Sequence, residues 1–187
     1  MRWRRGATVA EPVATTPWRF WAVFAGLAAV SLFWRMLPLG TAGHGLPGPD
    51  LLACLVMAWV LRRPDYMPAP LIAGVILLED LLLMRPPGLW AAVMVLGAEF
   101  LRARQPGMRA LPFALEWAFV SVVLAAMWMV ERLAMAVLMV GAPALGASLV
   151  QLLLTVLAYP LAVLFSHHVL RVRKPATGEV DALGRPL

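Results

Sequence analysis

The stretch LIAGVILLEDLLLMRPPG, residues 71–88, decides the fold class. It is apolar over the length of a helix, and RPPG then supplies the residues that end helices. Two adjacent acids, Glu79 and Asp80, stand inside the apolar run. A carboxylate in an apolar helix is costly unless it is paired, hydrated or protonated. The pair could serve catalysis, an ion path, docking or local packing.

Composition places the whole chain in the same class as this stretch. The 187 residues are 62% hydrophobic and only 14% charged, whereas soluble domains carry about 25% charged residues. We therefore expect one integral membrane domain. The net charge of +6 sits in short loops and tails, which indicates orientation in a membrane rather than nucleic-acid binding. The single cysteine, Cys54, excludes a disulfide framework within the chain and a cysteine-based metal cluster.

Six apolar runs predict an all-α, polytopic membrane protein with six transmembrane helices. The second and fourth runs are shorter than the roughly 17–25 residues of a usual span, so we expect them to pack against other helices. Between residues 131 and 146, either the fifth helix is long and tilted or a short outer segment lies at the interface. The runs cover residues 18–37, 50–61, 68–84, 88–101, 111 to about 130, and about 147–170.

The distribution of basic residues predicts the orientation. With six spans, thirteen of the sixteen basic residues fall on one side, leaving Arg35, Arg85 and Arg132 on the other. The positive-inside rule then places both termini in the cytoplasm. We expect a cytoplasmic tail over residues 1–17, a membrane domain over 18–170, and a flexible cytoplasmic tail over 171–187.

Tryptophans and small residues suggest how the helices meet their surroundings. Trp18, Trp34, Trp59 and Trp90 lie near the ends of apolar runs, which is typical of interfacial anchors. The first run also carries small residues four positions apart, and such spacing lets helices approach closely. Internal packing and docking of a partner helix are both open for it. The small residues are Ala22, Ala25, Gly26 and Ala29.

Two further acids lie near the inner ends of their helices. Glu99 stands three residues before Arg102, a spacing that permits an ion pair on one helix face. Glu116 lies about one turn into the fifth helix. It could snorkel, form a local pair, or join a network between helices that is linked to partner docking.

Glu79 and Asp80 lie roughly 17 Å from the inner end of their helix, so they are nearer the outer face. Because neighbours on a helix diverge, we expect one acid to face the bundle and the other to reach towards Arg85 or the outer headgroups. A packing role competes with a role towards a partner or the outer loop. An ion relay is disfavoured, since no further acids or histidines line up at similar depth.

The sequence carries no catalytic signature. It has no nucleophile elbow, no zinc-binding His-Glu-x-x-His helix and no phosphate-binding glycine-lysine loop. We therefore expect a protein that is not an enzyme and that uses no cofactor and no metal.

Residues 49–88 resemble the rod shape-determining protein MreD family. The positions that match are Pro49, Asp50, Arg63, Pro64, Gly74, Asp80 and Gly88. In the sixth run, Tyr159 and Pro160 resemble the mid-helix proline that precedes the family's basic tail. The chain departs from the pattern at Glu79 and in the proline-rich sequence MRPPG.

The resemblance implies a non-enzymatic inner-membrane scaffold of the bacterial elongation complex, which supports lateral peptidoglycan synthesis and rod shape. It implies a fold similar to the S components of energy-coupling-factor transporters. The implied partners are MreC and, through the complex, the MreB filament, RodA and its penicillin-binding transpeptidase, together with membrane lipids and no nucleic acid. The alternative function is a vitamin-type binding component of a transporter, for which the outer loops are short.

The resemblance and the charges together select the candidate residues for partner binding or structure. Because only Asp80 matches the family position, we expect Asp80→Ala to weaken complex assembly more than Glu79→Ala. The candidates are Asp50, Arg63, Pro64, Gly74, Glu79, Asp80, Arg85, Gly88 and Pro160.

Overall fold

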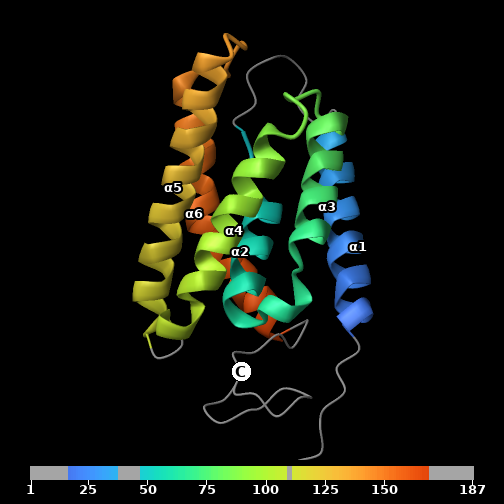
Figure 1. Ribbon diagram of the computed structural model, residues 1–187, viewed down its shortest axis with the longest axis vertical. Helices are drawn as coiled ribbons and strands as arrows, with labels where there is room; N and C mark the ends of the chain where they lie inside the picture. Colours follow the sequence, from blue (N-terminus) through green and yellow to red (C-terminus); the bar gives the residue numbers. More distant parts are fainter. Residues whose placement is uncertain (1–16, 38–46, 109–110, 169–187) are drawn as a thin grey trace, which may run out of the picture.

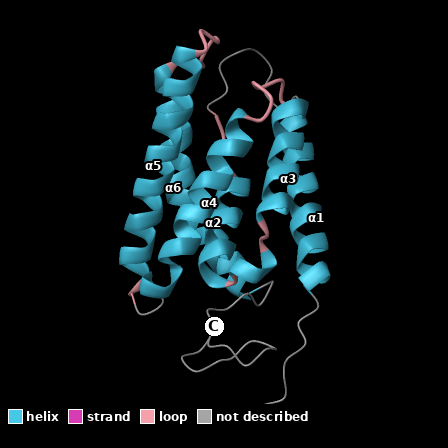
Figure 2. Cartoon of the chain, in the orientation of Figure 1, coloured by secondary structure: helices cyan, strands magenta, loops and turns pink. Residues whose placement is uncertain are grey.

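A computed structural model of the chain describes residues 17–37, 47–108 and 111–168. Over these residues the protein has six α-helices, one short 3₁₀ helix and no strand (Figure 1, Figure 2), so the predicted all-α class is confirmed. The elements are α1 (Pro17–Met36), α2 (Leu51–Arg62), η1 (Pro64–Tyr66), α3 (Ala69–Leu82), α4 (Leu89–Met108), α5 (Phe113–Val137) and α6 (Leu145–His168).

The helices run side by side and alternate in direction (Figure 1). We call the end at which α1 begins and α6 ends the inner end, and the opposite end the outer end. Helix α2 lies in the middle of the bundle and packs chiefly against α6 and α4, while α3 packs against α4. Of the six α-helices, α1 makes the sparsest contacts, and these are chiefly with α2, η1 and α3.

The core surrounds α2, whose residues from Leu52 to Arg62 are all buried. Trp59 is completely buried and donates a hydrogen bond from Nε1 to Ser166 Oγ at 3.0 Å. Trp90 is buried as well. The expectation that these two tryptophans lie at an interface is therefore wrong, because both side chains fill space between helices. Trp18 and Trp34 are exposed, as interfacial anchors would be.

Two helix ends differ from their predicted positions. Helix α4 continues through the sequence RARQPGM to Met108, although Pro106 predicts a loop there. Pro106 stands two residues before the end of the helix, so its missing N–H removes one hydrogen bond of the last turn. Helix α5 is continuous to Val137, so the long-helix alternative is correct and Glu131 lies within it.

Two of the described helices, α5 and α6, are long and apolar enough to cross a membrane. Only 28% and 33% of their apolar windows are buried inside the protein, whereas the core helix of a soluble protein would be mostly buried. Such exposed apolar surface supports a membrane environment. The other described helices do not meet the same criterion of length and hydropathy, so the six-span topology stays a prediction. The predicted tails fall almost entirely outside the described residues.

Candidate functional site

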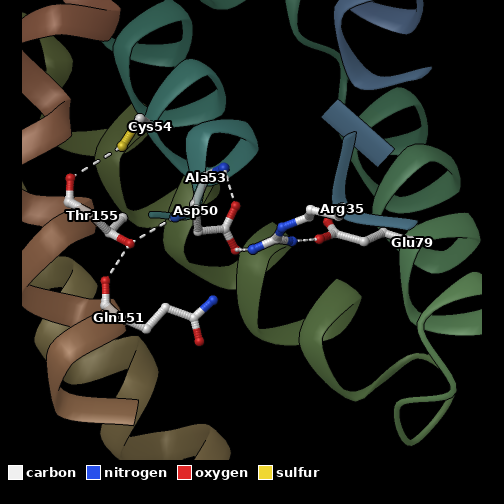
Figure 3. Close-up of polar contacts among 7 residues, drawn as sticks. All are labelled: Arg35, Asp50, Ala53, Cys54, Glu79, Gln151 and Thr155. Carbon is white, nitrogen blue, oxygen red and sulfur yellow. Dashed lines mark hydrogen bonds and ion pairs between the residues drawn. The ribbon is translucent and has the colours of Figure 1, made fainter. Parts of the chain in front are cut away.

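Near the outer end, one arginine joins three helices (Figure 3). Arg35 of α1 forms an ion pair with Glu79 of α3, and its second terminal nitrogen lies 3.7 Å from the carboxylate of Asp50. Glu79 is completely buried, while the Arg35 side chain is 18% exposed. With Thr155 of α6, described next, these residues form what we call the outer polar cluster.

Asp50 connects the start of α2 to α6. Its carboxylate accepts a hydrogen bond from the N–H of Ala53 at 3.0 Å, which caps the first turn of α2. Its own N–H donates to Thr155 Oγ1 at 2.9 Å, and the thiol of Cys54 donates to the carbonyl of Thr155 at 3.2 Å (Figure 3). Asp50 therefore caps one helix and fixes it against another.

Asp80 accepts hydrogen bonds at the N-terminus of α4. Its carboxylate accepts hydrogen bonds from the N–H groups of Gly88 and Ala91, both at 3.2 Å. A carboxylate at this position satisfies donors that have no partner within the helix and complements the helix dipole. Gly88 adopts a φ of +83°, a backbone conformation that favours glycine. Asp80 and Gly88 thus build the turn RPPG together.

Both acids of the opening stretch face protein, so the expectation that only one would do so is wrong. They diverge around α3, as adjacent residues must, but α3 has α1 on one side and α4 on the other. Arg85 forms no ion pair with Asp80. It donates its main-chain N–H to the Asp80 carbonyl at 2.9 Å. The N–H groups of Gly88 and Ala91 both donate to Asp80 Oδ2, and Oδ1 is buried without a partner among the described residues.

Towards the inner end, a second buried group joins α2, α5 and α6. Glu116 Oε1 lies 2.9 Å from Arg62 Nη1 and accepts a hydrogen bond from the Tyr159 hydroxyl at 3.0 Å. All three side chains are buried. We call them the inner polar cluster. Among the alternatives for Glu116, a network between helices is therefore correct, and snorkelling or a pair within one helix is not.

The predicted pair of Glu99 and Arg102 is confirmed on α4. Arg102 also donates a hydrogen bond to the carbonyl of Met67. Because Met67 lies between η1 and α3, this arginine ties the inner turn to α4.

The remaining predicted residues do not gather at one site. Arg63 is the C-cap of α2, and Pro64 begins η1 at the inner turn. Gly74 is exposed on α3, and a Cβ built there would meet no heavy atom within 4 Å. Pro160 lies inside α6 beside the buried Tyr159. The nine candidates are therefore spread from one end of the bundle to the other.

A cavity of about 350 Å³ opens at the outer end between the turn after α3 and the connection from α5 to α6. We call it the outer cavity. The polar and aromatic lining of the outer cavity comprises Arg85, Trp128, Glu131, Arg132, Ser148 and Gln151. Several of these residues also line a smaller recess, which extends towards Asp50 and Thr155.

The small residues of α1 lie on its outward face. Ala22, Ala25, Gly26 and Ala29 are all exposed, whereas Phe24 on the opposite face is completely buried. A side chain added at Gly26 would meet no heavy atom within 4 Å. Internal packing is therefore the wrong explanation of this pattern. We call these four residues the small-residue face of α1.

Sequence reasoning missed the partners of the buried acids. Arg35 and Arg62 were counted only as charges that set the orientation, and Thr155 was not singled out. The signal was available in part, since each buried carboxylate requires a donor or a cation at its own depth. Within the described ranges, no group of three or more histidine, cysteine, aspartate or glutamate side chains could hold a metal ion.

Comparisons of the chain with protein-family models, curated proteins and solved structures find no match.

Proposed function

We propose that this protein is a membrane scaffold of the bacterial elongation complex and that it binds the transmembrane helix of MreC. The resemblance of residues 49–88 to the MreD family supports the identity of the complex. The exposed apolar surfaces of α5 and α6 support a membrane location.

The observation that carries the proposal is the small-residue face of α1. Small side chains in a row let a second helix approach closely, and in lipid such packing drives association. The large side chains Trp18 and Phe33 flank the row on the same face, and they are 61% and 69% exposed. The face is thus a row of small apolar side chains between two bulky ones, which suits one helix from another chain.

The proposed topology has six spans with both termini in the cytoplasm of a bacterial inner membrane. Helix α1 begins and α6 ends at the same end of the bundle, as an even number of spans requires (Figure 1). Through MreC, the scaffold would join the MreB filament, RodA and its penicillin-binding transpeptidase. We assign it no enzymatic step.

Co-purification of MreC in mild detergent tests the proposal. Gly26→Leu should abolish retention of MreC, because the added side chain projects from the docking face and not into this protein. Ala126→Leu is the matched control, since Ala126 is exposed on α5. If the unaltered protein retains no MreC, or if its depletion leaves rod-shaped cells unchanged, the proposal is wrong.

The alternative, a vitamin-type carrier, would need the outer cavity as its binding site. At about 350 Å³ the cavity lies at the small end of the range of roughly 300–1,000 Å³ for ligand pockets. A thermal-shift screen with vitamins decides between the two functions. Specific and saturable stabilisation by one vitamin would favour the carrier.

A further inference from the structure

The outer cavity carries charge of both signs. Arg85 comes from the turn after α3, while Glu131 and Arg132 lie side by side near the outer end of α5. Two guanidinium groups therefore share the lining with one carboxylate. A single negative charge on a ligand would neutralise the three.

The two arginines differ in how they are held. Arg132 Nη1 donates hydrogen bonds to the Pro143 carbonyl at 2.9 Å and to Ser148 Oγ at 3.0 Å, and the guanidinium lies 5.7 Å from the centre of the Trp128 ring. The half-buried side chain of Arg85 forms no hydrogen bond and no ion pair with any residue that the structure describes. One cation of the cavity is thus fixed in place, and the other has its donors available.

Two indole N–H groups, from the buried Trp90 and the half-buried Trp128, lie among the same walls. Trp90 lines the smaller recess and Trp128 lines both spaces. Their Nε1 atoms are buried and have no hydrogen-bond partner within the described part of the chain. Trp90 as a whole is only 8% exposed. A buried donor without an acceptor costs about 1–3 kcal/mol, so the site favours a ligand that brings acceptor oxygens.

We propose that the outer cavity binds a monoanionic phosphodiester that also carries hydroxyl groups, such as a glycerol phosphodiester headgroup. Guanidinium groups match the geometry and charge of phosphate oxygens, which gives Arg85 and Arg132 their role. Glu131 accepts a hydrogen bond from a ligand hydroxyl. The amide of Gln151 supplies a neutral donor for a remaining oxygen, whereas the Ser148 hydroxyl already donates to the Ala144 carbonyl and accepts from Arg132.

The position of the cavity favours a lipid as the source of this headgroup. Met84 lines the outer cavity and Met139 lies in the adjoining connection between α5 and α6; they are 92% and 94% exposed. These apolar side chains offer a surface for acyl chains next to the polar walls. The inference does not depend on MreC, and only its lipid form depends on a membrane location.

Native mass spectrometry of the full chain in detergent tests the proposal. The probes are phosphatidylglycerol, phosphatidylethanolamine and soluble glycerophosphoglycerol, which is the same phosphodiester without acyl chains. We expect phosphatidylglycerol to bind best, and Arg85→Gln to weaken its binding by roughly 10- to 100-fold, the range for a lost hydrogen bond to a charged group. Arg104→Gln is the matched control, because this substitution removes the same charge from an exposed position at the inner end of α4.

A second variant, Trp128→Phe, keeps an aromatic ring against Arg132 and removes only the indole donor. It should weaken phosphatidylglycerol binding several-fold while the helical circular dichroism stays unchanged. Binding of glycerophosphoglycerol with the same dependence on Arg85 would support the site and assign it a soluble ligand. Equal binding by the Arg85→Gln and Arg104→Gln variants, or no preference for phosphatidylglycerol over phosphatidylethanolamine, would overturn the proposal.

Discussion

The inner and outer polar clusters each pair a buried carboxylate with an arginine, but they differ in burial and in the helices that they join. The inner cluster joins Arg62, Glu116 and Tyr159, all buried, between helices that pack closely. The outer cluster joins Arg35, Glu79 and Asp50, and its arginine remains 18% exposed. One cluster lies inside the core, while the other attaches the least tightly packed helix to it.

The difference indicates which helix is most easily detached from the rest of the bundle. Helices α2, α5 and α6 are joined by packing as well as by a charge network, so loss of the network leaves charge buried in a rigid core. Helix α1 makes few contacts, and its outer half depends on the ion pairs of Arg35. Since α1 also carries the small-residue face, its attachment decides whether that face is presented to a partner.

The largest effect is expected for Arg62→Ala at the inner cluster. Removing one member of a buried ion pair leaves the other charged and unpaired, which costs about 3–5 kcal/mol. Unfolding in mixed detergent micelles measures the loss. Arg104→Ala, at an exposed position on α4, is the control and should change stability little. Equal stability of the two variants would show that the inner cluster contributes nothing.

Glu79→Ala should lower the free energy of unfolding by less, about 1.5–3 kcal/mol. In this variant Arg35 can still pair with Asp50 and still contacts solvent. The loss should be confined to α1. Hydrogen exchange of the α1 amides measures it, with Glu99→Ala on exposed α4 surface as the control. Faster exchange throughout the bundle would contradict a local role.

Glu79 holds the helix that carries the small-residue face. We therefore expect Glu79→Ala to reduce MreC retention more than Asp80→Ala, which is the reverse of the order that the family resemblance alone implies.

Asp80→Ala removes the acceptor for two N–H groups at the start of α4 and should cost about 1–2 kcal/mol, as for other helix caps. Asp80→Asn keeps an acceptor oxygen and should cost less. Unfolding of both variants in the same micelles measures the difference. Equal losses for the two variants would show that the negative charge, and not the acceptor oxygen, matters most.

Gly88→Ala should have the smallest effect, about 1 kcal/mol, since an L residue is strained at a φ of +83°. Space is not the cause, because the nearest atom to an added Cβ is Leu77 Cδ1 at 3.8 Å. Gly74→Ala is the control and should be neutral or slightly stabilising, since Gly74 lies within helix α3 and faces open space. Equal losses at the two glycines would contradict the backbone explanation.

Apolar runs and their proline and glycine boundaries were enough to predict six helices, and each predicted run overlaps one observed helix. The pair of Glu99 and Arg102 was predictable because both residues lie on one helix, where spacing fixes their distance. The end of α4 was not predictable, because Pro106 removes one hydrogen bond of the last turn and the helix still continues to Met108.

Contacts between helices could not be predicted from the sequence. That Arg35 meets Glu79 depends on how α1 lies against α3, and residues 44 positions apart carry no spacing rule. The same holds for Glu116 and Tyr159. The burial of Trp59 was misjudged and the exposure of Gly26 was left open, because an apolar helix in an apolar chain does not reveal which of its faces points inward. The outer cavity depends on two connections whose relative position only the structure shows.

Photocrosslinking in living cells tests the central claim, that the small-residue face of α1 holds the MreC helix, most directly. A photoreactive amino acid would replace Gly26 in one variant and Ala126 on the exposed surface of α5 in the other. We predict a crosslink to MreC from position 26 and none from position 126. A crosslink from position 126 alone, or none from either position in cells that contain both proteins, would contradict the claim.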